Sequence, residues 1–261
     1  MPLLFLLTLL SACSGPEMSL SKARQVAELP SPPNATRLAV DSSSFAHYLR
    51  SFPLKASDSV YLFDGRPKYR QDVQAAVLDI DVGTRDLQQC ADAVMRLRAE
   101  YLWKQKAYSK IAFHFVNGQN CEYSQYAKGF RPVFKGNRFS WVKKQAESYS
   151  HKTFRNYMDL VFSYAGTASL IKELKKVSLG EVQIGDVLIQ SGNPYGHAVV
   201  VMDVAVASSG KRYFLLAQSY MPAQDIHILK NPTGGIWYSS DASTIHTPEW
   251  TFSATDLHRF P

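Results

Sequence analysis

The spacing of hydrophobic residues divides the chain into a first part with helical periodicity and a later part with runs typical of strands. The clearest helical pattern contains five largely apolar residues at intervals of three and four positions: Leu87, Cys90, Val94, Leu97 and Tyr101. These intervals place side chains on one face of a helix. Asp86, with Gln89 three positions later, is typical of a capped helix start. The pattern predicts a helix that starts after Asp86 and carries Cys90 on its inward face.

Weaker patterns predict other elements. For the first two thirds of the chain we expect a short capped helix at 45–52, a hairpin at Asp64-Gly65, strands at 75–82, 111–116 and 122–126, a long basic and aromatic loop with a short helix at 128–149, and two helices at 150–177 interrupted near Gly166. After Gly180 the pattern predicts strands at 187–190, 198–206 and 213–219. Helices followed by antiparallel strands, without βαβ alternation, predict the α+β class.

Composition narrows the class of protein. The chain has 261 residues, 46% of them hydrophobic and 20% charged, which excludes a disordered or low-complexity protein. We expect residues 36–261 to form a single domain. The net charge of +7 is spread along the chain and not gathered in one block. This distribution allows a general attraction to polyanions but gives no reason to expect a nucleic-acid partner.

The three cysteines, Cys13, Cys90 and Cys121, form no C-x-x-C pair, so we expect neither a structural metal nor a cofactor. In an oxidising compartment, Cys90 and Cys121 could instead form a disulfide. Cys90 could also be an ordinary buried core residue. Cys121 follows a predicted turn and is the alternative reactive thiol.

The N-terminus carries a short apolar run, residues 3–10, which is below the length needed to span a bilayer. It ends in Leu10-Ser11-Ala12-Cys13, which resembles the lipobox of bacterial lipoproteins. The resemblance implies a signal peptide at 1–12, a lipid on Cys13, a tether at 13–35, and a place in the bacterial cell envelope on the periplasmic or outer-membrane side. The start of the chain, Met1-Pro2, lacks the basic residue that usually precedes the apolar part of a signal peptide. The alternative to the lipoprotein interpretation is an apolar N-terminus followed by an incidental cysteine.

A cysteine near a helix N-terminus, with a histidine arriving later on a strand, is the arrangement that cysteine hydrolases use. The helix dipole and an adjacent imidazolium favour the nucleophilic thiolate, and the histidine exchanges the proton. Cys90 and His197 fit these two roles. On this hypothesis the pKa of Cys90 lies below that of a free thiol.

The segments Gly185-Asp186-Val187 and Gly196-His197, each opening an apolar strand, are similar to those of NlpC-type peptidases and CHAP amidases. The resemblance implies a papain-like fold, in which the cysteine-bearing helix packs on an antiparallel sheet and residues 109–175 are an inserted segment. It implies Cys90 as nucleophile, His197 as base and Gln218 as the residue that orients the imidazole. A one-residue register shift would substitute Ser219 for Gln218. Gln89, or Gln88, is the candidate oxyanion donor.

The resemblance implies hydrolysis of an amide bond, with peptidoglycan peptide or another envelope polymer as the partner. The chain departs from those families around the nucleophile, where Gln89-Cys90-Ala91-Asp92 stands, and in the 107 residues that separate Cys90 from His197. Two alternatives remain open. One is a catalytically inactive binding module of the same fold, and the other is an acyltransferase that passes the thioester to an amine or alcohol.

The whole chain resembles a lipoprotein family known as domain of unknown function 4846. The segments that carry this resemblance are 86–93, 164–167 and 215–227. The family name supplies no activity. It supports a bacterial envelope setting by association.

Overall fold

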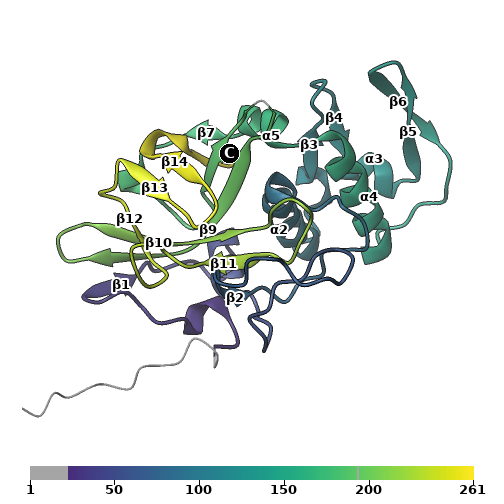
Figure 1. Ribbon diagram of the computed structural model, residues 1–261. Helices are drawn as coiled ribbons and strands as arrows, with labels where there is room; N and C mark the ends of the chain where they lie inside the picture. Colours follow the sequence, from purple (N-terminus) through teal and green to yellow (C-terminus); the bar gives the residue numbers. More distant parts are fainter. Residues whose placement is uncertain (1–22, 193) are drawn as a thin grey trace, which may run out of the picture.

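The computed structural model describes residues 23–192 and 194–261. The expected signal peptide, Cys13 and the first part of the expected tether lie outside the described residues. The protein is a mixed α+β structure with a mostly antiparallel sheet, as predicted (Figure 1). None of the helices within the described ranges is both long and apolar enough to cross a membrane.

A nine-stranded sheet forms the centre of the structure, with seven strands in the order β2-β11-β10-β9-β8-β15-β7. Its strands are β1 (Ala35–Arg37), β2 (Gln74–Val77), β7 (Lys175–Lys176), β8 (Val187–Gln190), β9 (His197–Ala207), β10 (Arg212–Gln218), β11 (His227–Leu229), β12 (Tyr238–Ser239) and β15 (Leu257–Arg259). β1 pairs with β9, and β12 with β10. The first nine residues of β9 are all buried, so both faces of this strand are covered.

Helices and small hairpins surround the sheet. The helices are α1 (Phe45–Arg50), α2 (Cys90–Lys104), α3 (Tyr123–Ala127), α4 (His151–Tyr164) and α5 (Thr167–Glu173). The hairpins are β3 (Ala112–His114) with β4 (Asn120–Glu122), β5 (Phe130–Lys135) with β6 (Arg138–Lys143), and β13 (Thr244–His246) with β14 (Thr251–Ser253). Figure 1 shows α2 between the sheet and the part formed by α3, α4 and the first two hairpins. The break between α4 and α5 at Gly166 is confirmed.

Helix α2 begins later than the sequence pattern indicates, because Asp86 has other partners. Its carboxylate accepts hydrogen bonds from the backbone N–H of Ala223 (2.7 Å) and the side chain of Gln89 (3.0 Å). Gln89 is the N-cap instead, and its backbone N–H donates to the Asp92 carboxylate at 3.1 Å. Cys90 is therefore the first residue of the helix.

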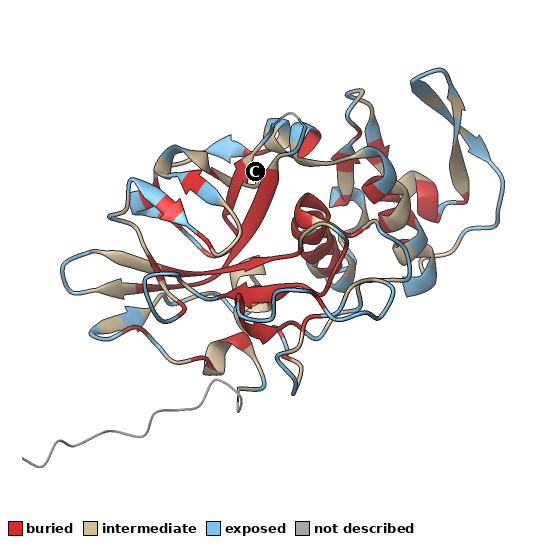
Figure 2. Cartoon of the chain, viewed as in Figure 1, coloured by how far each residue is buried: buried red, intermediate tan, exposed pale blue. Residues whose placement is uncertain are grey.

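Both faces of α2 are covered, which corrects the expectation of a single buried stripe. Arg96 and Glu100, which lie off the predicted apolar face, are 1% and 5% exposed. The Arg96 guanidinium donates to Glu100 (2.7 Å) and to the side chain of Gln88 (3.0 Å). His151 of α4 lies 3.0 Å from the same Glu100 carboxylate. The inserted segment thus covers the polar side of α2, and Figure 2 shows the helix almost wholly buried.

Within residues 128–149, the β5–β6 hairpin occupies 130–143, which corrects the predicted loop with a short helix. Phe134 and Phe139 pair across the hairpin, and Phe134 stacks on Tyr164 with ring centroids 4.6 Å apart. This aromatic packing favours paired strands over an open loop. The strand predicted at 122–126 is also corrected, because residues 123–127 form α3.

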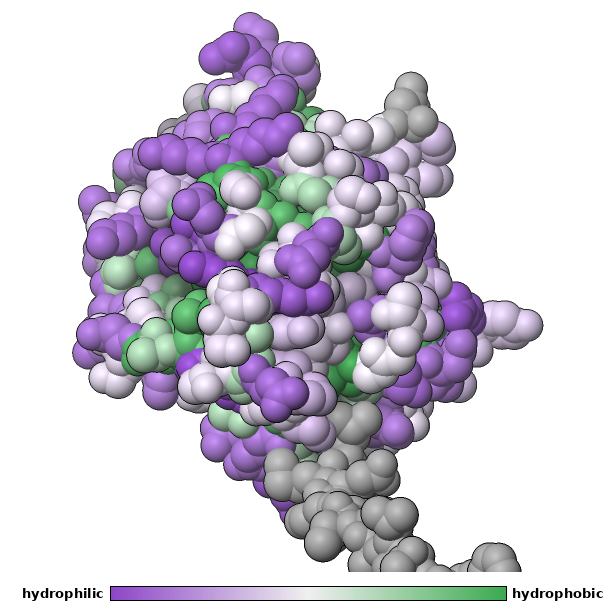
Figure 3. All heavy atoms as spheres, turned by 90° about the vertical axis from the view of Figure 1, so that its left-hand side faces the viewer, coloured by the Kyte–Doolittle hydropathy of each residue, from purple (hydrophilic) through white to green (hydrophobic). Residues whose placement is uncertain are grey.

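The expected tether ends before residue 26, because the segment that follows packs against the body of the protein. Val26 and Leu29 are fully buried, at 0% and 1% exposure. The indole N–H of Trp237 donates to the carbonyl oxygen of Pro30 at 2.8 Å. The prolines of residues 30–33 therefore belong to a docked segment and not to a linker. Elsewhere, on the face shown in Figure 3, hydrophobic side chains lie in separate patches among hydrophilic ones.

Because the docked segment buries apolar side chains, we expect it to contribute measurably to the stability of the fold. Leu29→Ala removes a fully buried side chain, so we expect the free energy of unfolding to fall by about 2–5 kcal/mol in urea titrations. Val133→Ala, at a position on the β5–β6 hairpin that is 38% exposed, is the control and is expected to change it by under about 1 kcal/mol. Equal, small effects of both substitutions would show that residues 26–29 do not contribute to the fold.

Candidate functional site

The N-terminal end of α2 meets the first residues of β9, and this contact sets Cys90 against Gly196, the residue before His197. The Cys90 Sγ lies 4.0 Å from the carbonyl oxygen of Gly196. The same sulfur accepts a hydrogen bond from the backbone N–H of Ala198. A Cβ at Gly196 would lie 2.2 Å from the carbonyl oxygen of Gln190, so the close approach requires glycine. Steric crowding therefore explains why the residue before His197 is a glycine in this structure.

His197 and Gln218 are joined as the sequence analysis expected. The Nε2 of His197 lies 2.9 Å from the Oε1 of Gln218. A bulge shifts the β9–β10 register between Leu215 and Leu216, and this shift decides which residue faces the imidazole. Ser219, the alternative, is fully buried, and its hydroxyl lies 2.9 Å from the carbonyl oxygen of Gln88 and 2.8 Å from that of Gln224. Ser219 thus faces backbone and not a ligand-binding space.

Three aromatic rings surround His197 and were not found by the sequence analysis. The ring centroids of Tyr220, Trp250 and Phe252 lie 5.0, 5.2 and 5.9 Å from that of His197. Burial among them lowers the pKa of His197 to about 4, although the hydrogen bond that His197 donates to Gln218 opposes this shift. The imidazole is therefore neutral at neutral pH, as a general base must be.

The pKa of Cys90 departs from the sequence-based expectation. Burial, and next the charge of Asp92, raise the pKa of the thiol to about 11. The backbone N–H groups of Ala198, Ala91 and Cys90 itself act in the opposite direction but are outweighed. Within the described part of the chain, no hydrogen bond joins the thiol to the His197 ring. The resting pair is a neutral thiol and a neutral imidazole, which corrects the expectation of a stabilised thiolate.

Asp92 is the second unusual group at the start of α2. Burial raises the pKa of its carboxyl to about 8. One carboxylate oxygen accepts from the backbone of Gln89, whereas the other is buried without a partner among the described residues. Its charge at alkaline pH opposes ionisation of the Cys90 thiol two residues away.

A cleft of about 310 Å³ opens at Cys90, between the start of α2, the start of α5 and the loop before β9. Gln89 lines it, as the expected role of an oxyanion donor requires, but its side chain donates to Asp86 at 3.0 Å. The side-chain oxygen of Gln88 instead accepts from Arg96. Cys90 itself is 7% exposed and lines the cleft, together with Gly166, Tyr195 and Met221.

The other candidate thiol lies elsewhere. Cys90 and Cys121 are both free, so the alternative disulfide is not formed. Cys121 is fully buried in β4, and burial raises the pKa of its thiol. A substrate has no access to it in this structure.

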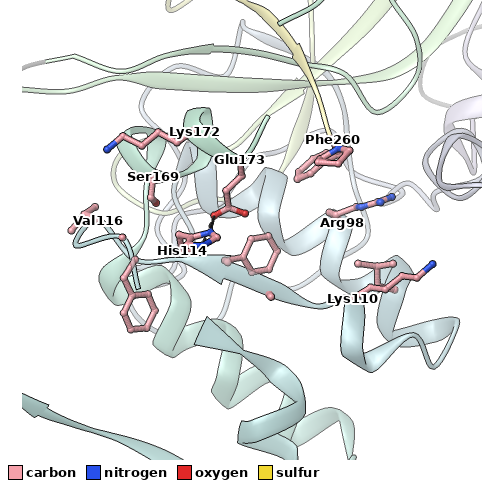
Figure 4. Close-up of a pocket in the computed structure, with 14 residues that line it drawn as sticks. Arg98, Lys110, His114, Val116, Ser169, Lys172, Glu173 and Phe260 are labelled. Atoms are coloured by element: carbon pink, nitrogen blue, oxygen red, sulfur yellow. Dashed lines mark hydrogen bonds and ion pairs between the residues drawn. The ribbon is translucent and has the colours of Figure 1, made fainter. Parts of the chain in front are cut away.

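A larger cavity of about 700 Å³ is lined by the outer side of α5 and by β3 (Figure 4). It contains Ser169, His114 and Glu173, the residue types of a serine hydrolase, and the Nδ1 of His114 lies 3.3 Å from the Glu173 carboxylate. However, the hydroxyl of Ser169 is bound to both the N–H and the carbonyl oxygen of Gly166, at 3.1 Å each. Ser169 therefore stabilises the start of α5, and the geometry favours Cys90 as the nucleophile.

Two charged residues behind Gln218 were also missed. Glu249 accepts a hydrogen bond from the Nε2 of Gln218 at 2.7 Å, and Lys68 forms an ion pair with Glu249 at 2.5 Å. They lie far from Gln218 in the sequence, so no local pattern signals them. Across residues 23–192 and 194–261, no group of three or more His, Cys, Asp or Glu side chains could hold a metal ion.

Comparison with known proteins supports the whole-chain resemblance. The family model for a domain of unknown function (4846) matches residues 26–259, which is nearly all of the described part of the chain. No curated protein and no solved structure matches the chain. The family match starts at Val26, the first buried residue of the docked N-terminal segment. The chain thus belongs to the family described as domain of unknown function 4846.

Proposed function

We propose that this protein is a papain-like cysteine hydrolase that cleaves an amide bond, with Cys90 as nucleophile, His197 as base and Gln218 as the residue that orients His197. The observation that carries the proposal is the contact between the first residue of α2 and the backbone on both sides of His197, whose Nε2 is bound to Gln218. The arrangement has the order of parts that the NlpC-type resemblance implies: a nucleophile at a helix start, a base opening one strand and a polar residue ending the next.

The neutral resting pair fits general-base catalysis. The Nδ1 of His197 takes the proton of the Cys90 thiol as the sulfur attacks the carbonyl carbon of the substrate. Backbone N–H groups at the start of α2 donate to the oxyanion that forms. The imidazolium then gives its proton to the departing amine, which leaves an acyl thioester on Cys90. Water hydrolyses the thioester, with His197 again acting as base.

The substrate class and location rest on the sequence resemblances. The NlpC-type motif favours a peptide of peptidoglycan, and the lipobox-like Leu10-Ser11-Ala12-Cys13 favours a lipid-anchored protein of the bacterial envelope. On this proposal the lipid on Cys13 is the protein's one attachment to the membrane.

A catalytically inactive binding module is the second candidate. The raised pKa of Cys90 and the absence of a hydrogen bond from its thiol to His197, within the described residues, favour this alternative. A binding module needs the cleft but not the thiolate. The two candidates therefore differ in the reactivity of Cys90.

The raised pKa predicts the pH dependence of alkylation. Since burial disfavours the thiolate, iodoacetamide should react with Cys90 more slowly at pH 7 than with a free thiol of pKa roughly 8.5. The rate should rise with pH without a plateau below about pH 9, because the thiol ionises at about 11. In Cys121→Ala protein, mass spectrometry follows the label on the peptide that contains Cys90, separately from any label on Cys13. A plateau below pH 7 would instead demonstrate a stabilised thiolate.

The charge of Asp92 predicts the effect of a neutral replacement. In Asp92→Asn the side-chain oxygen can still accept from the backbone of Gln89, but the negative charge beside Cys90 is lost. We expect the pKa of Cys90 to fall and alkylation at pH 9 to accelerate several-fold. Asp58→Asn, at an exposed position, is the control with no expected change. Unchanged alkylation of Asp92→Asn would show that the charge of Asp92 does not act on the thiol.

Hydrolysis itself is tested with purified bacterial sacculi and the soluble muropeptides made from them. We expect the protein to release peptide fragments that mass spectrometry identifies. Cys90→Ala should abolish release, and His197→Ala should lower the rate by roughly 10²–10⁴-fold because the general base is lost. Cys121→Ala should retain the activity.

If the unaltered protein binds sacculi but releases nothing, and Cys90→Ala binds equally well, the binding module is the correct function. If it neither binds nor cleaves these polymers, peptidoglycan is not the substrate class.

A further inference from the structure

A line of polar side chains leads from His197 into the interior on the side away from the cleft. His197 is bound to Gln218, Gln218 to Glu249, and Glu249 to Lys68, at 2.9, 2.7 and 2.5 Å. The side chains of Lys68 and Glu249 are only 7% and 11% exposed. An ion pair removed from water to this extent is costly unless its geometry is well satisfied. Its position directly behind Gln218 suggests a role in the site.

The hydrogen-bond partners determine which way the Gln218 amide points. The Nδ1 of His227 lies 2.9 Å from the carbonyl oxygen of Asp225, which can only accept, so His227 carries its proton on Nδ1. The Nε2 of His227 is then an acceptor, and it lies 3.4 Å from the nitrogen of the Gln218 amide. The carboxylate of Glu249 is a second acceptor for the same nitrogen. Two acceptors on one side require the amide NH₂ there, so the amide oxygen faces His197.

This orientation fixes the tautomer of His197. The amide oxygen of Gln218 accepts, so the Nε2 of His197 must carry the proton. In a neutral imidazole the other nitrogen, Nδ1, then has a free lone pair. That is the form that general-base catalysis on the Cys90 thiol requires.

From this geometry we infer that Glu249 and Lys68 are positioning residues of the candidate site. Glu249 holds the Gln218 amide with its oxygen toward His197, and Lys68 binds the Glu249 carboxylate on its other side. The pair thereby keeps the proton of His197 on Nε2 and leaves Nδ1 free to accept the proton of Cys90. This inference deepens the proposed hydrolase, on which its catalytic consequence rests.

The turn that carries Glu249 supports the assignment. The N–H of Trp250 donates to the hydroxyl of Thr247, and the N–H of Thr247 to the carbonyl oxygen of Trp250, at 2.9 and 2.8 Å. The indole of Trp250 lies against His197 and donates to Gln190 of β8 at 3.0 Å. One rigid turn thus both shields the imidazole and supplies the carboxylate behind Gln218.

The test measures the tautomer of His197 directly, from the ¹⁵N chemical shifts of its ring nitrogens in full-length labelled protein at pH 7. In the unaltered protein we expect the proton on Nε2. In Glu249→Met the side chain no longer offers an acceptor to the Gln218 amide, and His227 at 3.4 Å is the weaker partner that remains. We expect the Gln218 amide to turn and the proton to move to Nδ1 in a large part of the molecules. Cys90-dependent hydrolysis should then fall on the order of 10²-fold in kcat with little change in KM.

Lys68→Met separates the two roles of the pair, because it leaves the carboxylate acceptor and removes the cation. The tautomer should be retained, whereas the pKa of His197 should rise, since Lys68 opposes protonation of the imidazole. The titratable groups that face His197 are Lys68, Cys90, Tyr220, His227 and Glu249, and all but Lys68 are kept in this variant. Asp241→Asn, which breaks the exposed ion pair with Lys211, is the control.

A folded Glu249→Met protein with the proton still on Nε2 overturns the inference. If Glu249→Met does not fold because Lys68 is left buried and unpaired, the double variant Lys68→Met/Glu249→Met removes both charges and is judged by the same shifts. If the tautomer changes but the unaltered protein shows no Cys90-dependent hydrolysis, the positioning role stands and the proposed hydrolase fails.

Discussion

The contact between the start of α2 and the start of β9 is the constraint on which the rest of the site depends. The strand that opens with His197 is preceded by Gly196, where any side chain would collide with the carbonyl oxygen of Gln190 at the end of β8. The contact sets the first residue of α2 against the strand that opens with His197. It also has a cost, because a thiol so closely packed loses the water that would stabilise its charged form. The same packing that joins the two residues therefore keeps both of them neutral.

Hydrophobic periodicity predicted those helices and strands whose buried residues follow a pattern within the element itself. The strand at 187–190 and the break at Gly166 were predicted at their observed positions, and the α+β class followed from the order of the elements. The start of α2 was misplaced because Ala223, more than 100 residues away, binds the side chain of Asp86 that would have capped the helix. Long-range partners of this kind leave no mark on the local pattern.

In the candidate site, too, local sequence predicted some features, whereas others depend on residues that are distant in the chain. Cys90, His197 and Gln218 were found from motif and spacing, because each lies at the end of a regular element. The choice of Gln218 over Ser219 depends on a bulge in β9–β10, and a sequence does not display a register shift of one residue. The pKa values of Cys90 and His197 follow from burial by distant rings and by the inserted helices, so local sequence could indicate which groups titrate but not in which direction they shift.

The docked segment at residues 26–33 also limits how far the cleft could lie from a membrane. If Cys13 carries a lipid, about ten residues join it to the described part of the chain, and a fully extended chain spans at most roughly 3.6 Å per residue. Residue 23, where the described chain begins, would then lie within about 40 Å of the bilayer surface. A hydrolase held in this way would act on the layer of polymer nearest its own membrane and on nothing farther out, so the length of the anchor, more than affinity, would select the material that it reaches.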